Sequence, residues 1–150
     1  MDILSIAIIA FVIMEFANII ILYFFPTSRK GNGVACFNAY ERSKEDSEMH
    51  NFVRYLVNWV AGTKLIFIFL LVVIVIVGST ITKIFGVVAL ILSILSYFWR
   101  LNPIIRKMDR EGQITPKGYS KTLCLMIICF VTGFALALLI FLALNPNVFA

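Results

Sequence analysis

The chain has few of the side chains that build metal sites and catalytic centres. Its 150 residues include one histidine and three cysteines. Metal sites need several such ligands at close spacing, and a disulfide framework needs paired cysteines, so neither is expected here. Around the single His50 we also find no nucleophile with a base and an orienting group. The sequence therefore predicts no metal, no cofactor and no recognisable catalytic triad.

Several functional motifs are missing as well. The glycine-containing segment after Pro26 lacks the Gly-Lys-Ser/Thr ending of a phosphate-cradling loop. No nucleic-acid motif accompanies the net charge of +5, so we expect no nucleic-acid partner. The N-terminal apolar run has no basic leader and no cleavage site, and it is longer than a typical signal peptide core. We therefore expect this run to be retained as a transmembrane helix.

Charged residues are scarce, and long apolar runs take their place. Only 14% of the residues are charged, 61% are hydrophobic, and the mean hydropathy is +0.99. Four runs are long enough to cross a bilayer, at residues 3–25, 57–78, 81–99 and 122–144. The sequence predicts an all-α polytopic integral membrane protein, a single domain over residues 1–150 with four transmembrane helices in a bundle.

Lysine and arginine are distributed unevenly around these runs. The loops at residues 26–56 and 100–121 carry most of them, whereas the opposite side offers only Lys83. The positive-inside rule then places both loops in the cytoplasm and both termini outside, N-out and C-out, in a plasma (inner) membrane. The basic loop residues are Arg29, Lys30, Arg42, Lys44, Arg54, Arg100, Arg106, Lys107, Arg110, Lys117 and Lys121.

Polar side chains also occur inside two of the apolar runs. Glu15 lies near the middle of the first run, and Asn18, three residues later, shares its helix face. Arg54, Asn58 and Lys64 belong to a polar stripe on the second span. Glu15 and Lys64 lie at similar depths from the cytoplasmic edge. We expect these two to form an ion pair, with Asn18 and Asn58 completing the hydrogen bonds.

Three interpretations of these groups remain open. The pair could lock two helices together, or the polar groups could line a pathway for an ion, a proton or a small polar solute. Alternatively, Lys64 could extend its side chain to the interface and contact neither Glu15 nor Asn18. A short carboxylate such as Glu15 has no such route to water.

Both basic loops are predicted to contain helix. Ser43 can cap a helix, and no proline or glycine follows until Gly62, so the second helix is expected to run from Ser43 to Val77, about 50 Å. In the other loop, Asn102-Pro103 is typical of a helix start and Gly112 of a stop. This segment is expected to lie at the membrane surface, with its basic residues toward anionic lipid head groups: Arg106, Lys107 and Arg110.

The layout is similar to that of the glutathione-using membrane transferases of eicosanoid and detoxification metabolism. The shared features are four spans in about 150 residues, outside termini and charged groups where the second span begins. That family carries an Arg-x-x-Asn-x-x-Glu pattern there, whereas residues 41–51 read Glu-Arg-Ser-Lys-Glu-Asp-Ser-Glu-Met-His-Asn. The spacings differ, so no site residue is carried across.

Two functions follow as expectations. The first is a non-enzymatic transport or channel-type component, or an accessory subunit, that uses the polar groups of spans one and two. Because four spans enclose little room, this function implies a homo-oligomer or a partner membrane protein. The alternative is a membrane enzyme that acts on a lipid or thiol substrate at the cytoplasmic face.

Overall fold

The computed structural model describes residues 1–29 and 33–149. Lys30, counted above among the basic loop residues, lies outside the described residues. Within these residues the regular structure is helical apart from one isolated β-bridge, and four helical segments are long and apolar enough to cross a membrane. The predicted all-α membrane bundle is confirmed.

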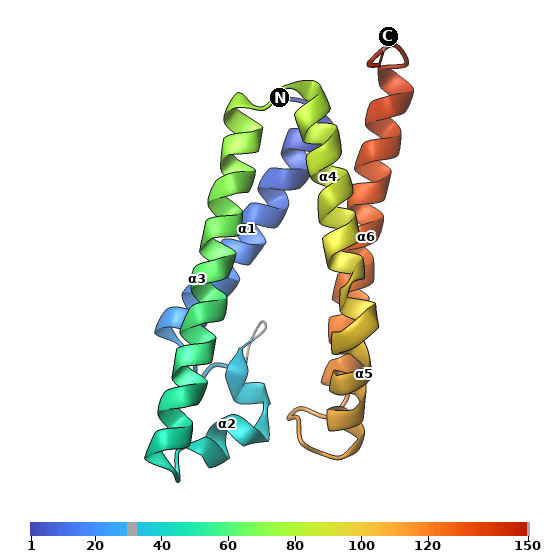
Figure 1. Cartoon of the computed structure of the whole chain (residues 1–150). Helices are drawn as coiled ribbons and strands as arrows, with labels where there is room; N and C mark the ends of the chain where they lie inside the picture. The colour runs from blue at the N-terminus through green and yellow to red at the C-terminus, as the bar shows by residue number, and fades with distance from the viewer. Residues whose placement is uncertain (30–32, 150) are drawn as a thin grey trace.

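The spans match the apolar runs closely. They are α1 (Ile3–Phe24), α3 (Ser47–Val77), the pair α4 (Thr80–Leu95) and α5 (Tyr97–Arg110), and α6 (Tyr119–Leu144). The first loop adds the short 3-10 helix η1 (Val34–Cys36) and α2 (Asn38–Ser43). Both chain termini lie at one end of the bundle and both long loops at the other (Figure 1).

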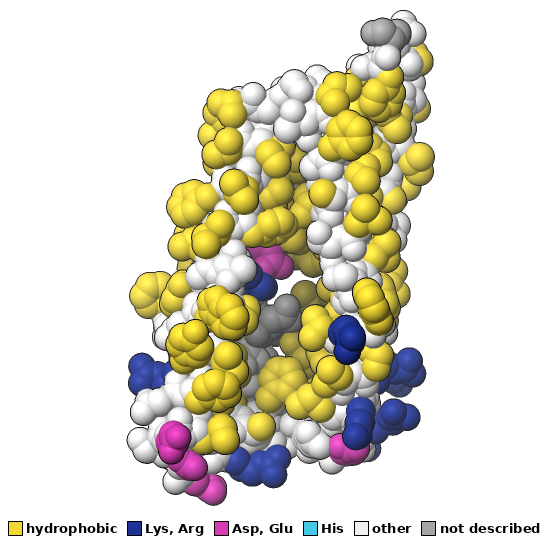
Figure 2. All heavy atoms as spheres, viewed as in Figure 1, with side chains coloured by type: hydrophobic (Ala, Val, Ile, Leu, Met, Phe, Trp, Pro, Cys, Tyr) yellow, Lys and Arg dark blue, Asp and Glu magenta, His cyan; other side chains and the backbone are white. Residues whose placement is uncertain are grey.

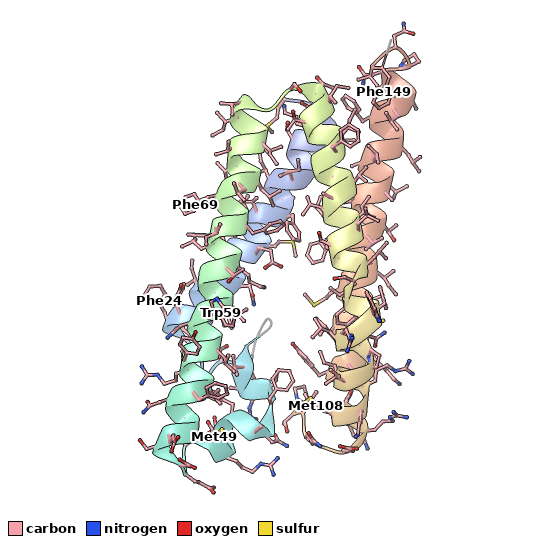
Figure 3. All side chains as sticks on the ribbon, viewed as in Figure 1. Phe24, Met49, Trp59, Phe69, Met108 and Phe149 are labelled. Carbon is pink, nitrogen blue, oxygen red and sulfur yellow. The ribbon has the colours of Figure 1, made fainter. Side chains whose placement is uncertain are left out.

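The helices form two pairs that meet mainly near the termini. α1 packs along α3, and α4 with α5 packs along α6. The largest apolar core joins the two pairs at the end that holds the termini, through residues such as Leu4, Ile8 and Val87. Toward the loops the pairs diverge (Figure 1), and exposed side chains such as Phe24 and Phe69 point away from the bundle (Figure 3). The space between the pairs holds the site described below.

The start of α3 differs from the prediction. Ser43 ends α2, and α3 begins only at Ser47. The side chain of Asp46 accepts hydrogen bonds from the backbone N–H groups of Glu48 and Met49, at 2.9 and 3.2 Å. Asp46 has the extended backbone of an N-cap and satisfies N–H groups that the first helical turn leaves unpaired. The helix is therefore 31 residues long and continuous, but four residues shorter than predicted at its start.

The prediction of a separate surface helix starting at Asn102-Pro103 is wrong. Pro103 lies inside α5, which continues roughly in line with α4 (Figure 1). The helix is interrupted earlier, at Ser96, whose Oγ donates a 2.6 Å hydrogen bond to the Ser93 carbonyl. Such a side-chain bond competes with the helical backbone pattern. The predicted stop is confirmed, because α5 ends at Arg110 and Gly112 adopts φ +70°, a conformation that favours glycine.

The two long loops bind each other, which the sequence did not predict. The Thr115 N–H donates to the Cys36 carbonyl at 2.8 Å, and the Asn38 N–H donates to the Gln113 carbonyl at 2.9 Å. The Asn38 side chain donates to the Gly112 carbonyl at 2.9 Å and accepts from Thr115 Oγ1 at 3.0 Å. The loops are thus joined across the opening between the helix pairs.

Candidate functional site

The structure brings together three of the five polar residues predicted inside spans one and two. Lys64 Nζ lies 2.7 Å from Glu15 Oε2 and donates a 2.8 Å hydrogen bond to Asn18 Oδ1. The Glu15 and Lys64 side chains are 20% and 29% exposed, so neither is sealed between the helices. Lys64 therefore neutralises the intramembrane carboxylate while both groups keep an accessible side.

Close packing of α1 on α3 positions this cluster. Glu15 and Asn18 lie on one face of α1 because residues three apart are neighbours on a helix surface. Ala61, one turn before Lys64, is fully buried in the core between these helices, together with Ile19. The small side chain lets the helices approach closely, so the ammonium of Lys64 can reach both acceptors.

Asn58 does not complete the cluster, and Arg54 also lies apart from it. Both are exposed and line a small hollow of ≈ 120 Å³ beside Tyr40. Asn58 precedes Lys64 by six residues, which is about 120° around the helix and about 9 Å along it. Asn58 and Lys64, both assigned to the predicted polar stripe, therefore face different surroundings.

The Glu15–Lys64 pair lies on the wall of a cavity of ≈ 520 Å³ between the helix pairs. Figure 2 shows a hollow there, with an acidic and a basic side chain at its upper edge. Three polar residues of the wall come from α4, from α5 and from Ser96 between these helices, and the rest of the wall on this side is mostly apolar. The polar lining is Glu15, Asn18, Lys64, Ser93, Ser96 and Tyr97; apolar lining residues include Phe11, Met14, Leu101, Ile105, Leu123 and Phe130.

The paired loops support one wall of this cavity. Tyr97, Ile105 and Leu123 line the cavity and also belong to an apolar core that contains Cys36 and Ile114 from the two loops. Burial raises the pKa of the Cys36 thiol, so it stays protonated at neutral pH and is a poor nucleophile. Cys36 is therefore a packing residue in this wall.

His50 has a local partner that the sequence did not reveal. Its Nδ1 lies 3.0 Å from Ser43 Oγ, and its ring lies beside Tyr40. Ser43 is buried, and its hydroxyl donates to the Tyr40 carbonyl at 2.7 Å. The Tyr40 carbonyl thus competes with the imidazole for the single hydroxyl proton of Ser43, which does not favour a serine nucleophile activated by histidine. Across residues 1–29 and 33–149, no group of three or more His, Cys, Asp or Glu is placed to hold a metal.

The three basic residues predicted to meet lipid head groups separate into two sets. Arg106 and Arg110 line a groove of ≈ 570 Å³ between α5 and α6. Lys107 lies outside it, is 70% exposed, and lies 3.9 Å from Glu111. The groove also contains Asp109, which sequence reasoning missed.

Asp109 holds the start of α6. Its carboxylate accepts hydrogen bonds from the N–H groups of Gly118 and Ser120, at 2.9 and 3.0 Å, and from Ser120 Oγ at 2.5 Å. An acidic cap usually stands immediately before its helix. Asp109 instead belongs to the preceding helix, so no local sequence pattern could have identified it.

Comparisons with protein-family models, with curated proteins and with solved structures find no match for this chain. Its function is therefore inferred from its own residues.

Proposed function

We propose that this chain is a small membrane protein of the transport or channel type and that the central cavity is its solute site. The observation that carries the proposal is the position of the Glu15–Lys64 pair on the cavity wall, with part of each side chain accessible. Charged groups in the middle of a membrane are costly and commonly mark ion or substrate pathways. A purely structural pair would not require an adjoining cavity.

The chemistry of the wall defines the class of solute. The Glu15 carboxylate can bind a cation or a proton, the Lys64 ammonium can bind an anionic group, and Asn18 offers an amide. The volume of ≈ 520 Å³ is in the range of small-molecule sites. The site therefore suits an inorganic ion or a small polar solute that replaces one partner of the Glu15–Lys64 ion pair.

Exposed aromatic side chains support a position of the Glu15–Lys64 pair in the half of the membrane that is nearer the loops. Tyr55 stacks on Trp59, and both are 61% exposed on α3; Figure 3 shows Trp59 between Met49 and Phe69. Such residues gather at the membrane interface. Lys64 lies five residues beyond Trp59, which is about 7.5 Å deeper along the helix. With both loops in the cytoplasm of a plasma (inner) membrane, the solute would enter from the cytoplasmic side.

A single bundle does not explain passage to the other side. The core around Leu4, Ile8 and Val87 fills the end that holds the termini. Permeation therefore requires either a rearrangement of the two helix pairs or a site completed by another copy or by a partner membrane protein.

Ion flux in proteoliposomes tests the proposal. The purified chain is expected to conduct protons or alkali cations above the level of empty liposomes, and Glu15→Gln should lower the flux about tenfold or more because it removes the charge in the site. Glu41→Gln is a matched control, since Glu41 forms a 2.7 Å ion pair with Lys44 outside the cavity. Equal flux from wild type and Glu15→Gln would overturn the proposal. A chemical activity that needs His50 or Arg54 but not Glu15 would favour a membrane enzyme.

A further inference from the structure

The groove between α5 and α6 is a second hollow, separate from the central cavity. Its volume is ≈ 570 Å³, and four cationic side chains from the two sides of the α5–α6 turn surround its outer part. Figure 2 shows Lys and Arg side chains gathered at this end of the molecule.

The four cations of the groove form no close ion pair with the described residues. They are Arg106, Arg110, Lys117 and Lys121, and none takes part in an ion pair in the described part of the chain. Asp109 is the only acidic residue of the lining; it is 6% exposed, and three hydrogen bonds from Gly118 and Ser120 occupy it. Lys117 interacts electrostatically with Asp109, but four positive charges against one negative charge leave the groove net positive, so it attracts anions.

The groove changes from polar to apolar toward the membrane. The hydrogen bonds between Asp109 and Ser120 place the start of α6 beside the end of α5. From that level α6 runs back toward the membrane, so Leu125 and Ile128 lie about 7 to 12 Å deeper than Ser120. Trp99, a 77% exposed aromatic of α5, lies ten residues before Asp109 and therefore about 15 Å deeper than that level. The cations thus lie at the outer end of the groove, and the exposed apolar residues Leu125 and Ile128 lie nearer the middle of the spans.

We infer that this groove binds an anionic phospholipid, with its phosphate among the four cations and one acyl chain along Leu125 and Ile128. Arg guanidinium groups bind phosphate oxygens with paired hydrogen bonds, and Lys adds point charge. Asn102 supplies a further polar group, because its Oδ1 is buried and has no hydrogen-bond partner in the described structure. Its carboxamide oxygen can accept a hydrogen bond from a hydroxyl of the head group.

Binding of a short-chain lipid to the full-length chain tests the inference. The probe is dioctanoylphosphatidylglycerol, titrated into detergent-purified protein and measured by native mass spectrometry. The double variant Arg106→Gln/Lys117→Gln should weaken binding about tenfold or more, because each cation near an anionic lipid contributes to attraction. The matched control is Lys44→Gln/Lys107→Gln, which removes the same charge outside the groove and should change the affinity less than about twofold. An equal loss of lipid affinity in both double variants would mean that the lipid is attracted by the overall positive charge. That result would overturn the proposed binding site.

Three further measurements distinguish lipid from soluble phosphate and from misfolding. Dioctanoylphosphatidylcholine should bind about tenfold more weakly, since its head group has no net charge. Glycerol 3-phosphate should bind weakly. Ile128→Ser should reduce the affinity for the lipid but leave the affinity for glycerol 3-phosphate unchanged. If glycerol 3-phosphate binds as tightly as the lipid, the ligand is a soluble phosphate and the lipid assignment is wrong. Thermal unfolding without lipid verifies folding, and Lys121→Gln, a single exposed change, should reproduce part of the loss if the double variant is unstable.

Discussion

At the scale of single residues, the contact between Lys64 and Glu15 makes a measurable prediction. Because Nζ and Oε2 are 2.7 Å apart, Glu15→Gln and Lys64→Met should have non-additive effects on unfolding, with a coupling of about 1 kcal/mol. Thermal unfolding of both single variants and the double variant in detergent measures this coupling. Simple additivity would show that the two groups are not partners. Full recovery of stability in the double variant would indicate a lock between α1 and α3 and would count against transport.

Asp2 provides a second prediction at this scale. It accepts a 2.7 Å hydrogen bond from the Ser5 N–H at the start of α1 and contacts Lys83 at 3.0 Å. Burial acts to raise the pKa of Asp2, but the hydrogen bonds from Ser5 and Lys83 outweigh it and lower the pKa to about 2. A lowered pKa stabilises the fold above the ordinary value of 3.8, and this stability is lost as the pH falls toward 2.

The corresponding test compares Asp2→Asn with wild type across that range. Asn can still cap the helix but cannot titrate, so the stability difference between the two proteins should be largest above about pH 4 and shrink toward pH 2. Melting temperatures measured from pH 6 to pH 2 show the trend. A constant difference over this range would exclude the proposed role of the Asp2 carboxylate.

At the scale of elements, Asn38 joins the two loops. Its side chain donates to the Gly112 carbonyl and accepts from Thr115 Oγ1, so Asn38→Ala removes two hydrogen bonds at once. We expect a loss of about 1 to 2 kcal/mol, together with faster amide hydrogen exchange in both loops. Asn145→Ala, which removes a 2.9 Å bond to the Phe141 carbonyl at the other end, is the control. Protection lost in only one loop would contradict the joint role.

Two helix boundaries show where local sequence patterns fail. Ser43 and Asp46 are both competent caps, and only the observed hydrogen bonds of Asp46 decide between them. Proline ordinarily starts or breaks a helix, yet Pro103 is accommodated within α5, which packs against α6. Tertiary packing overrides helix propensity at such positions. The course of α5 through Pro103 therefore could not be predicted from residues 96–112 alone.

At the scale of the whole molecule, hydropathy was sufficient for the spans but not for the contacts between loops. The apolar runs predicted α1, α3 and α6 to within a few residues, except for the start of α3 in the loop. The contact between Glu15 and Lys64 was predicted because the two residues lie at similar depths in the first and second spans. The contacts of Asp109 with Gly118 and of Asn38 with Gly112 each join two different segments of the chain. The periodicity of apolar residues does not show how such segments align with each other.

Orientation in the membrane is a prediction for the whole chain. With Cys36, Cys124 and Cys129 replaced by serine, Asn147→Cys should react with a membrane-impermeant maleimide in intact cells, because the termini are expected outside. Glu48→Cys should react only after the cells are permeabilised. The reverse labelling would place the basic loops outside and would invert the proposed direction of solute entry.

The pairing of Glu15 with Lys64 has a consequence for biosynthesis. The two residues are 49 positions apart, and a ribosome takes roughly 2 to 10 s to add that length at 5–20 residues/s. During this interval α1 can enter the bilayer before its ammonium partner exists, although a charge there is unfavourable. Contact with the insertion machinery would relieve that cost until α3 arrives. The nascent chain is thus most vulnerable to quality-control proteases after its first helix, and truncation before Lys64 should shorten its lifetime in the membrane.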